Sequence, residues 1–95
     1  MNLLKKLFKK EPTHLNEPAP AIAKEVTARL SRAAELRLSG ECEQALVECN
    51  EVLLLHPTSH LAYHIRALTR YDMNDQQGAI QDWNRHKSLQ KSHAK

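Results

Sequence analysis

The chain has 95 residues, 41% of them hydrophobic, and a formal net charge of +3 at neutral pH. A chain of this length forms one small domain at most and buries only about two-thirds of the surface that it exposes when unfolded. Four lysines lie within the first ten residues, so the remainder is close to neutral. A nucleic-acid-binding protein usually carries a basic stripe on its folded part. No such stripe is evident, and we expect no nucleic acid as a partner.

Two cysteines, Cys42 and Cys49, are seven positions apart. On a helix this spacing corresponds to roughly 10 Å of rise, which is too far for a disulfide. No CxxC pair accompanies them, so a redox or metal site is disfavoured. The spacing favours two small buried residues in a reducing compartment, and we expect a cytoplasmic protein.

The first ten residues, MNLLKKLFKK, have the pattern of a short amphipathic helix. Apolar side chains fall on one side and lysines on the other: Leu3, Leu4, Leu7 and Phe8 against Lys5, Lys6, Lys9 and Lys10. Such a segment can contact an anionic membrane, but a helix shorter than about 12 residues is marginal in water and binds weakly. A solvated or partner-docking tail and a weak membrane contact both remain open. The segment is neither a signal peptide nor a membrane span.

Residues 11–20 contain three prolines and are expected to form a linker. Residues 1–20 are therefore a flexible tail, and residues 21–95 form the domain. Apolar residues with helical spacing predict four helices: about 21–39, about 41–55, from Thr58 or Ser59 to about Met73, and from Gln76 to about Lys91. Connections of two to four residues make neighbouring helices antiparallel, so the fold class is all-α.

The second pair of helices repeats the first at a spacing of 34 residues. Ala28, Ala33, Ala45, Leu46 and Leu55 correspond to Ala62, Ala67, Ala79, Ile80 and Leu89. This period is typical of helix-turn-helix solenoids. The paired alanines allow helices to cross at the usual ~8–10 Å. Arg32 precedes Glu48 by 16 residues and Arg66 precedes Asp82 by the same 16, which predicts an ion pair in each hairpin.

These features resemble the tetratricopeptide repeat family. The second copy matches its pattern at Tyr63, Ala67, Ala79 and Trp83, with Arg66, Arg70 and Lys91 as departures. The first copy matches at Ala33, Leu36, Ala45 and Pro57, with Arg29, Arg32 and Cys49 as departures. The resemblance implies an α-α superhelix of two repeats, at about 26–59 and about 60–93.

In this family the first helix of each repeat lines a concave groove that binds peptides or helices. The resemblance therefore implies a groove lined by Thr27, Leu30, Ala34, Arg37 and Leu38, and by Leu61, His64, Leu68, Tyr71 and Asp72. Members that grip a C-terminal carboxylate use Lys and Asn, which are absent at these positions. An apolar helix-in-groove mode fits better.

The end of the repeat stack is a second candidate surface. Two repeats are fewer than solenoids usually have, and terminal repeats normally need a polar cap. Ile80 and Trp83 are therefore expected to form an apolar, open end. Such an end predicts a homodimer, docking to a larger protein, or coverage by residues 3–8.

No arrangement of residues indicates catalysis. A nucleophile–base pair, a glycine-rich phosphate loop and paired catalytic carboxylates are all missing. His60 and His64 could share one helix face, but His56 lies beyond Pro57, and zinc needs three or four protein ligands. We expect no enzyme, no metal and no cofactor.

The predicted function is a protein–protein interaction adaptor. The alternative is a peripheral membrane factor anchored by its N-terminal segment.

Overall fold

The computed structural model describes residues 18–93 of the chain. Within this range four helices follow one another: α2 (Pro20–Leu38), α3 (Cys42–Leu55), α4 (His60–Asp72) and α5 (Gln76–His93). The described residues contain no strand. The predicted all-α fold is therefore confirmed, and the helices lie close to their expected bounds. The predictions for residues 3–10 concern a segment outside the described range.

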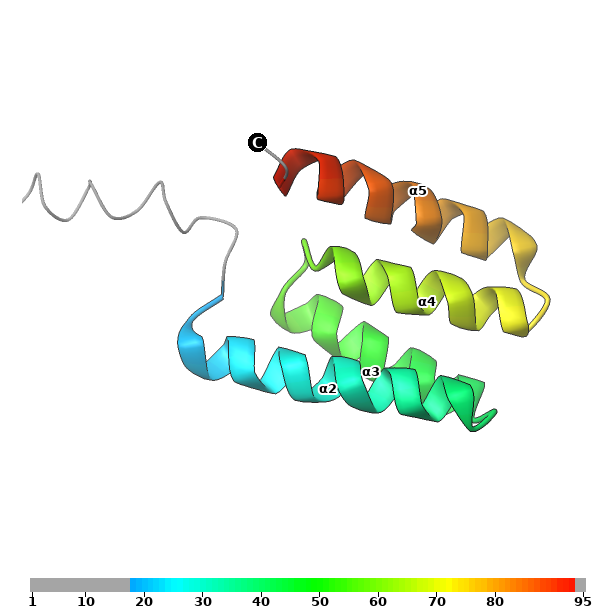
Figure 1. Ribbon diagram of the computed structural model, residues 1–95, viewed down its shortest axis with the longest axis horizontal. Helices are drawn as coiled ribbons and strands as arrows, with labels where there is room; N and C mark the ends of the chain where they lie inside the picture. The colour runs from blue at the N-terminus through cyan, green and yellow to red at the C-terminus, as the bar shows by residue number, and fades with distance from the viewer. Residues whose placement is uncertain (1–17, 94–95) are drawn as a thin grey trace, which may run out of the picture.

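Each helix packs against its neighbour in the sequence, and α2 also contacts α4. The colours of Figure 1 show that successive helices run in opposite directions, as the short connections require. Helix α4 therefore packs on both helices of the first hairpin. This arrangement leaves α5 with one described neighbour, α4, whereas α3 lies against both α2 and α4.

The two hairpin turns share one unusual backbone conformation. Gly40, between α2 and α3, has a φ of 86°, and Asn74, between α4 and α5, has a φ of 68°. Glycine adopts this left-handed region without strain, and asparagine tolerates it better than most other residues do. The two residues are 34 positions apart. A left-handed residue therefore lies at corresponding positions in both hairpin turns.

The starts of the helices are encoded by residues that suit a first turn. Pro20 occupies the first turn of α2, where its missing N–H leaves no bond unmade. The Ser59 hydroxyl accepts a hydrogen bond from the Ala62 amide at 3.3 Å and caps α4. Asp75 caps α5 in the same way, because its Oδ1 accepts a hydrogen bond from the Gly78 amide at 3.0 Å. Local sequence therefore fixes where these helices begin.

The core is built from small side chains. The alanines predicted at the helix crossings are all buried: Ala33 and Ala45 are 0% exposed, Ala67 is 4% and Ala79 is 6%. A central cluster contains Val26 of α2, Val52 of α3 and Ala62 of α4, with Leu30, Leu53 and Leu55 packed around it. This cluster joins the first hairpin to α4.

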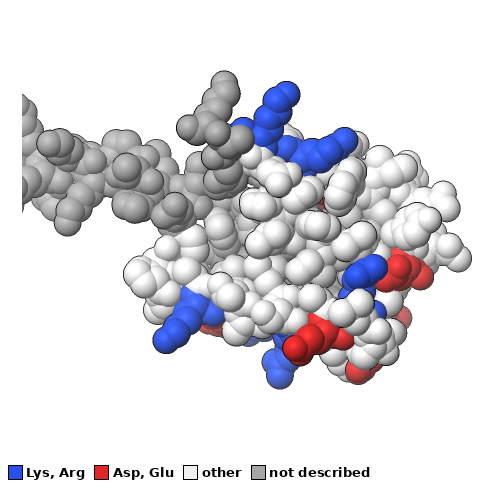
Figure 2. Space-filling model, viewed as in Figure 1, with Lys and Arg blue, Asp and Glu red and all other residues white. Residues whose placement is uncertain are grey.

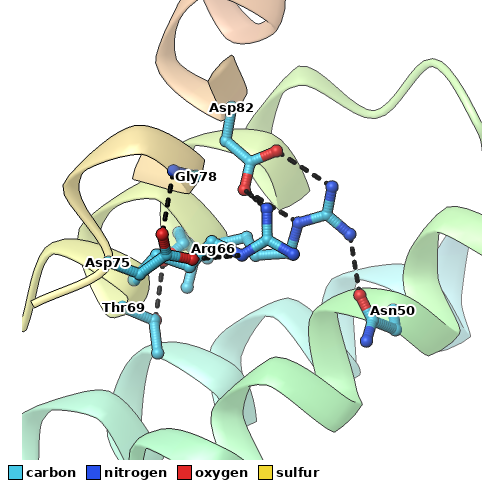
Figure 3. A network of polar contacts seen from close by, with 8 residues as sticks. Asn50, Arg66, Thr69, Asp75, Gly78 and Asp82 are labelled. Carbon is cyan, nitrogen blue, oxygen red and sulfur yellow. Dashed lines mark hydrogen bonds and ion pairs between the residues drawn. The ribbon is translucent and has the colours of Figure 1, made fainter. Parts of the chain in front are cut away.

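A polar network connects α3, α4 and α5 (Figure 3). Arg66 donates from Nε and Nη2 to the two carboxylate oxygens of Asp82, both at 2.9 Å, and from Nη1 to Asn50 Oδ1 at 2.8 Å. Arg70 Nη1 adds a third bond to Asp82 at 2.9 Å. The Asp82 side chain is only 5% exposed. The predicted Arg66–Asp82 ion pair is confirmed and joins α4 to α5, and the bond from Arg66 to Asn50 extends the network to α3.

In the first hairpin Glu48 has two arginine partners at different distances. Arg29 Nη1 lies 2.9 Å from Glu48, whereas Arg32 Nη1 lies 3.9 Å away, and the Arg32 side chain is 69% exposed. The predicted Arg32–Glu48 ion pair is therefore present but long, and Arg29 is the closer partner. Arg29 is also held by Glu25 at 3.1 Å, which directs it along α2. The second copy has Tyr63 at the corresponding position, so the repeat gave no sign of this arginine.

Candidate functional site

An open apolar hollow lies between α4 and α5. Its volume is about 550 Å³, and it is lined by Ala67, Leu68, Tyr71, Gln76, Ala79, Ile80 and Trp83. The hollow brings Leu68 and Tyr71, predicted to line a groove, together with Ile80 and Trp83, predicted to form an open end. Part of the predicted groove and the predicted open end therefore line the same hollow.

Large apolar side chains remain accessible around this hollow. Tyr71 is 65% exposed, Ile80 is 62% and Trp83 is 40%. The positions 34 residues earlier are different, because Cys49, which corresponds to Trp83, is 0% exposed, and Leu46, which corresponds to Ile80, is half-buried. Grouped exposed apolar residues mark interaction surfaces more often than scattered ones do. In the view of Figure 2, uncharged side chains fill the centre of the molecule, and the charged ones lie toward its margins.

The other predicted groove residues have several different environments. Leu30 packs against the core, and Ala34 is half-buried. Leu38 and Leu61 are 79% and 48% exposed, and Thr27 is exposed on α2. Arg37 Nε and Asp72 Oδ2, both from the predicted groove set, form an ion pair of 2.8 Å that joins α2 to α4. These residues therefore do not form one continuous surface with the hollow.

Three histidines gather beside the hollow. The ring centres of His64 and His86 are 4.7 Å apart, and those of His60 and His86 are 5.3 Å apart. His86 Nδ1 lies 2.9 Å from the His60 carbonyl oxygen. The spacing of His60 and His64 predicts that they share a face of α4, whereas His86 comes from α5, and no short-range pattern in the sequence links it to them. Among residues 18–93, no three or more His, Cys, Asp or Glu side chains are placed to hold a metal ion.

His64 connects this histidine cluster to the hollow. Its ring meets that of Trp83 edge-on, with centres 5.2 Å apart. Burial lowers the pKa of His64, and repulsion from His86 and Arg37 lowers it further. Since the ordinary pKa of histidine is about 6.5, His64 is neutral at neutral pH.

The two cysteines are predicted to differ strongly in reactivity. Both are free; Cys42 is half-buried, whereas Cys49 is fully buried, and burial raises its pKa to about 11. The thiolate is the reactive form, so iodoacetamide should modify Cys42 and spare Cys49 in the native protein near neutral pH. Peptide mapping by mass spectrometry measures both sites, with the denatured protein as the control. Equal labelling of both thiols in the native state would contradict the burial of Cys49.

Comparison of the chain with protein families, with curated proteins and with solved structures finds no match. None of the described helices is long and apolar enough to cross a membrane. The structure defines an all-α protein in which an apolar hollow and a histidine cluster lie side by side on α4 and α5.

Proposed function

We propose that the chain forms two helix-turn-helix repeats of the tetratricopeptide type and acts as a protein–protein interaction module. A helix of a partner protein docks in the hollow between α4 and α5. The repeat interpretation is supported by the left-handed turns at Gly40 and Asn74. It is also supported by the packing of α4 on both α2 and α3, because stacked repeats need such a contact.

The observation that carries this proposal is the difference in burial between equivalent positions. Cys49 is 0% exposed in the first repeat, whereas Trp83 is 40% exposed in the second. Helix α4 packs on the α2–α3 hairpin, and the α4–α5 hairpin offers the corresponding place to another helix. An incoming amphipathic helix would present residues at i, i+3, i+4 and i+7 to such a groove.

The expected affinity is weak. Full burial of a large apolar side chain contributes about 1.5–3 kcal/mol, and Tyr71, Ile80 and Trp83 are already partly buried. Association costs at least about 4 kcal/mol of lost translational and rotational freedom. These three anchor residues alone therefore leave at most about 5 kcal/mol of binding free energy, which corresponds to a dissociation constant of roughly 0.1–1 mM. Such an affinity is typical of reversible adaptors rather than of permanent complexes.

Replacing Ile80 with Lys tests the proposal. Ile80 lines the hollow and is 62% exposed, so a lysine there should leave folding unaffected and place a charge in the docking site. We expect Ile80→Lys to weaken capture of partner proteins from lysate by at least about tenfold, because desolvating an unpaired charge is unfavourable. Quantitative mass spectrometry of the captured proteins measures the effect.

Leu54→Lys is the matched control. Leu54 is a 78% exposed aliphatic residue on α3 and does not line the hollow. Both variants should keep helical circular dichroism, and Leu54→Lys should retain the partners of the natural chain. Equal capture by the two variants would contradict the proposed site. Light scattering over a range of concentrations would show whether a second copy of the chain occupies the hollow instead.

A further inference from the structure

Histidines occupy the repeat positions that form an aliphatic core in the first repeat. Val26 and Val52 cluster with Ala62 of α4, and Leu30 packs against them. Thirty-four residues later, Val26, Leu30 and Val52 correspond to His60, His64 and His86. Three of the aliphatic residues that receive α4 in the first repeat are therefore replaced by imidazoles in the second.

The structure keeps these three histidines together. His86 is 6% exposed, and His60 and His64 are half-buried. Trp83 links the cluster to the hollow, because its ring centre lies 5.2 Å from that of His64 and 5.1 Å from that of His86. Helix α4 docks on the α2–α3 hairpin, and a partner helix could dock on the α4–α5 hairpin in the same way. Such a helix would contact apolar side chains at one end and imidazoles at the other.

The side chains near His64 favour an acidic partner. Two basic side chains lie close to it: Arg37 of α2 and His86 of α5, whose ring centre is 4.7 Å from that of His64. The neighbouring carboxylates are already engaged: Asp72 is paired with Arg37 at 2.8 Å, and Asp82 is bound by Arg66 and Arg70. A docked helix would also remove water from His64, and a buried polar group without a partner is unfavourable. A carboxylate would relieve this by accepting a hydrogen bond from the His64 ring, and its negative charge would raise the lowered pKa of His64 and so favour the imidazolium.

From this juxtaposition we infer that the partner is an acidic amphipathic helix, whose apolar residues fill the hollow and whose Glu or Asp contacts His64 beside Trp83. The inference rests on the proposed function and names the chemistry of its partner. Residues 1–10 fit this site poorly, because their four lysines would face Arg37 and the histidines. A second copy docked through the same face would bring its own histidines.

A displayed library of amphipathic helical peptides tests the inference. Each peptide carries an apolar stripe along its helix, and the stripe positions are randomised among Leu, Ile, Phe and Met. The helix positions that border the stripe on either side are randomised among Glu, Gln and Lys. The library also contains residues 1–10 of this chain. Selection against the intact protein should enrich Glu on one side of the stripe. Selection against His64→Leu, which restores the residue of the first repeat, should enrich the same apolar residues without this preference for Glu.

Peptides from the selection are then titrated against the protein by the fluorescence of Trp83, the only tryptophan. A Glu peptide should bind roughly five to ten times more tightly than its Gln counterpart. Because the pKa of free His64 lies below the ordinary value of about 6.5, this advantage should grow as the pH falls through about 6.5 and below it, where His64 takes up its proton.

The outcomes separate the inference from the function on which it rests. Equal enrichment of Glu, Gln and Lys would overturn the acidic partner and leave the apolar docking site standing. Preferred selection of a lysine-rich peptide, or of residues 1–10, would also overturn it. If no peptide with an apolar stripe is enriched, both the inference and the proposed function fail.

Discussion

Asp82→Asn is expected to destabilise the protein by about 2–4 kcal/mol. Asp82 accepts three hydrogen bonds from Arg66 and Arg70, and its side chain is 5% exposed. Asparagine keeps the shape but removes the charge, so Arg66 loses its carboxylate partner and Arg70 keeps only Asp75, at 3.9 Å. The expected loss extends below the usual range of about 3–5 kcal/mol for breaking a buried ion pair, because the arginine side chains are 18% and 29% exposed.

Urea unfolding followed by circular dichroism measures this loss. Small domains have total stabilities of about 5–15 kcal/mol, so the midpoint should fall sharply. Glu48→Gln is the matched control at the same repeat position. Its effect should be much smaller, because its partner Arg29 lies nearer the surface and is also held by Glu25. Equal losses in the two variants would show that the three-helix network is not a major source of stability.

Ala45→Leu is expected to destabilise the protein by about 3 kcal/mol, at the upper end of the usual effect of overpacking. Ala45 of α3 is 0% exposed at the predicted crossing with α2, and helices that cross at alanines lie too close together to accept a larger side chain. The added carbon atoms must push the two helices apart or distort their side chains. Thermal unfolding followed by circular dichroism measures the shift in the midpoint.

Ala28→Leu provides the control for this substitution. Ala28 lies on the exposed side of α2, and leucine is nearly as good a helix former as alanine. Its effect should therefore stay within about 0.5 kcal/mol. If Ala45→Leu unfolds at the same temperature as Ala28→Leu, the α2–α3 crossing is looser than its burial indicates.

The sequence predicted the helices well because their limits depend on local chemistry. Pro20 starts α2, Ser59 caps α4, and Gly40 and Asn74 supply the left-handed turns. Helical spacing of apolar residues predicted the segments between these points. The 34-residue period also predicted that Ala33, Ala45, Ala67 and Ala79 lie at helix crossings, and all four are buried. Ala28 shares the period with the buried Ala62 but is exposed.

The candidate site was predicted only in pieces. Leu68, Tyr71, Ile80 and Trp83 were all named from the sequence, but they were assigned to two separate surfaces. Their union depends on how α4 lies against α5, which spacing along one helix does not specify. His86 was missed, although its correspondence with the buried Val52 could have drawn attention to it.

The sequence by itself therefore determined which segments are helical, where they turn and which positions must be small, because neighbouring residues control these properties. Only the tertiary structure decided that Glu48 pairs with Arg29 rather than mainly with Arg32, and that three histidines meet beside Trp83. Long side chains can reach several partners within a few ångströms. Which partner is bound depends on how the helices lie relative to one another, and residues throughout the chain contribute to that placement.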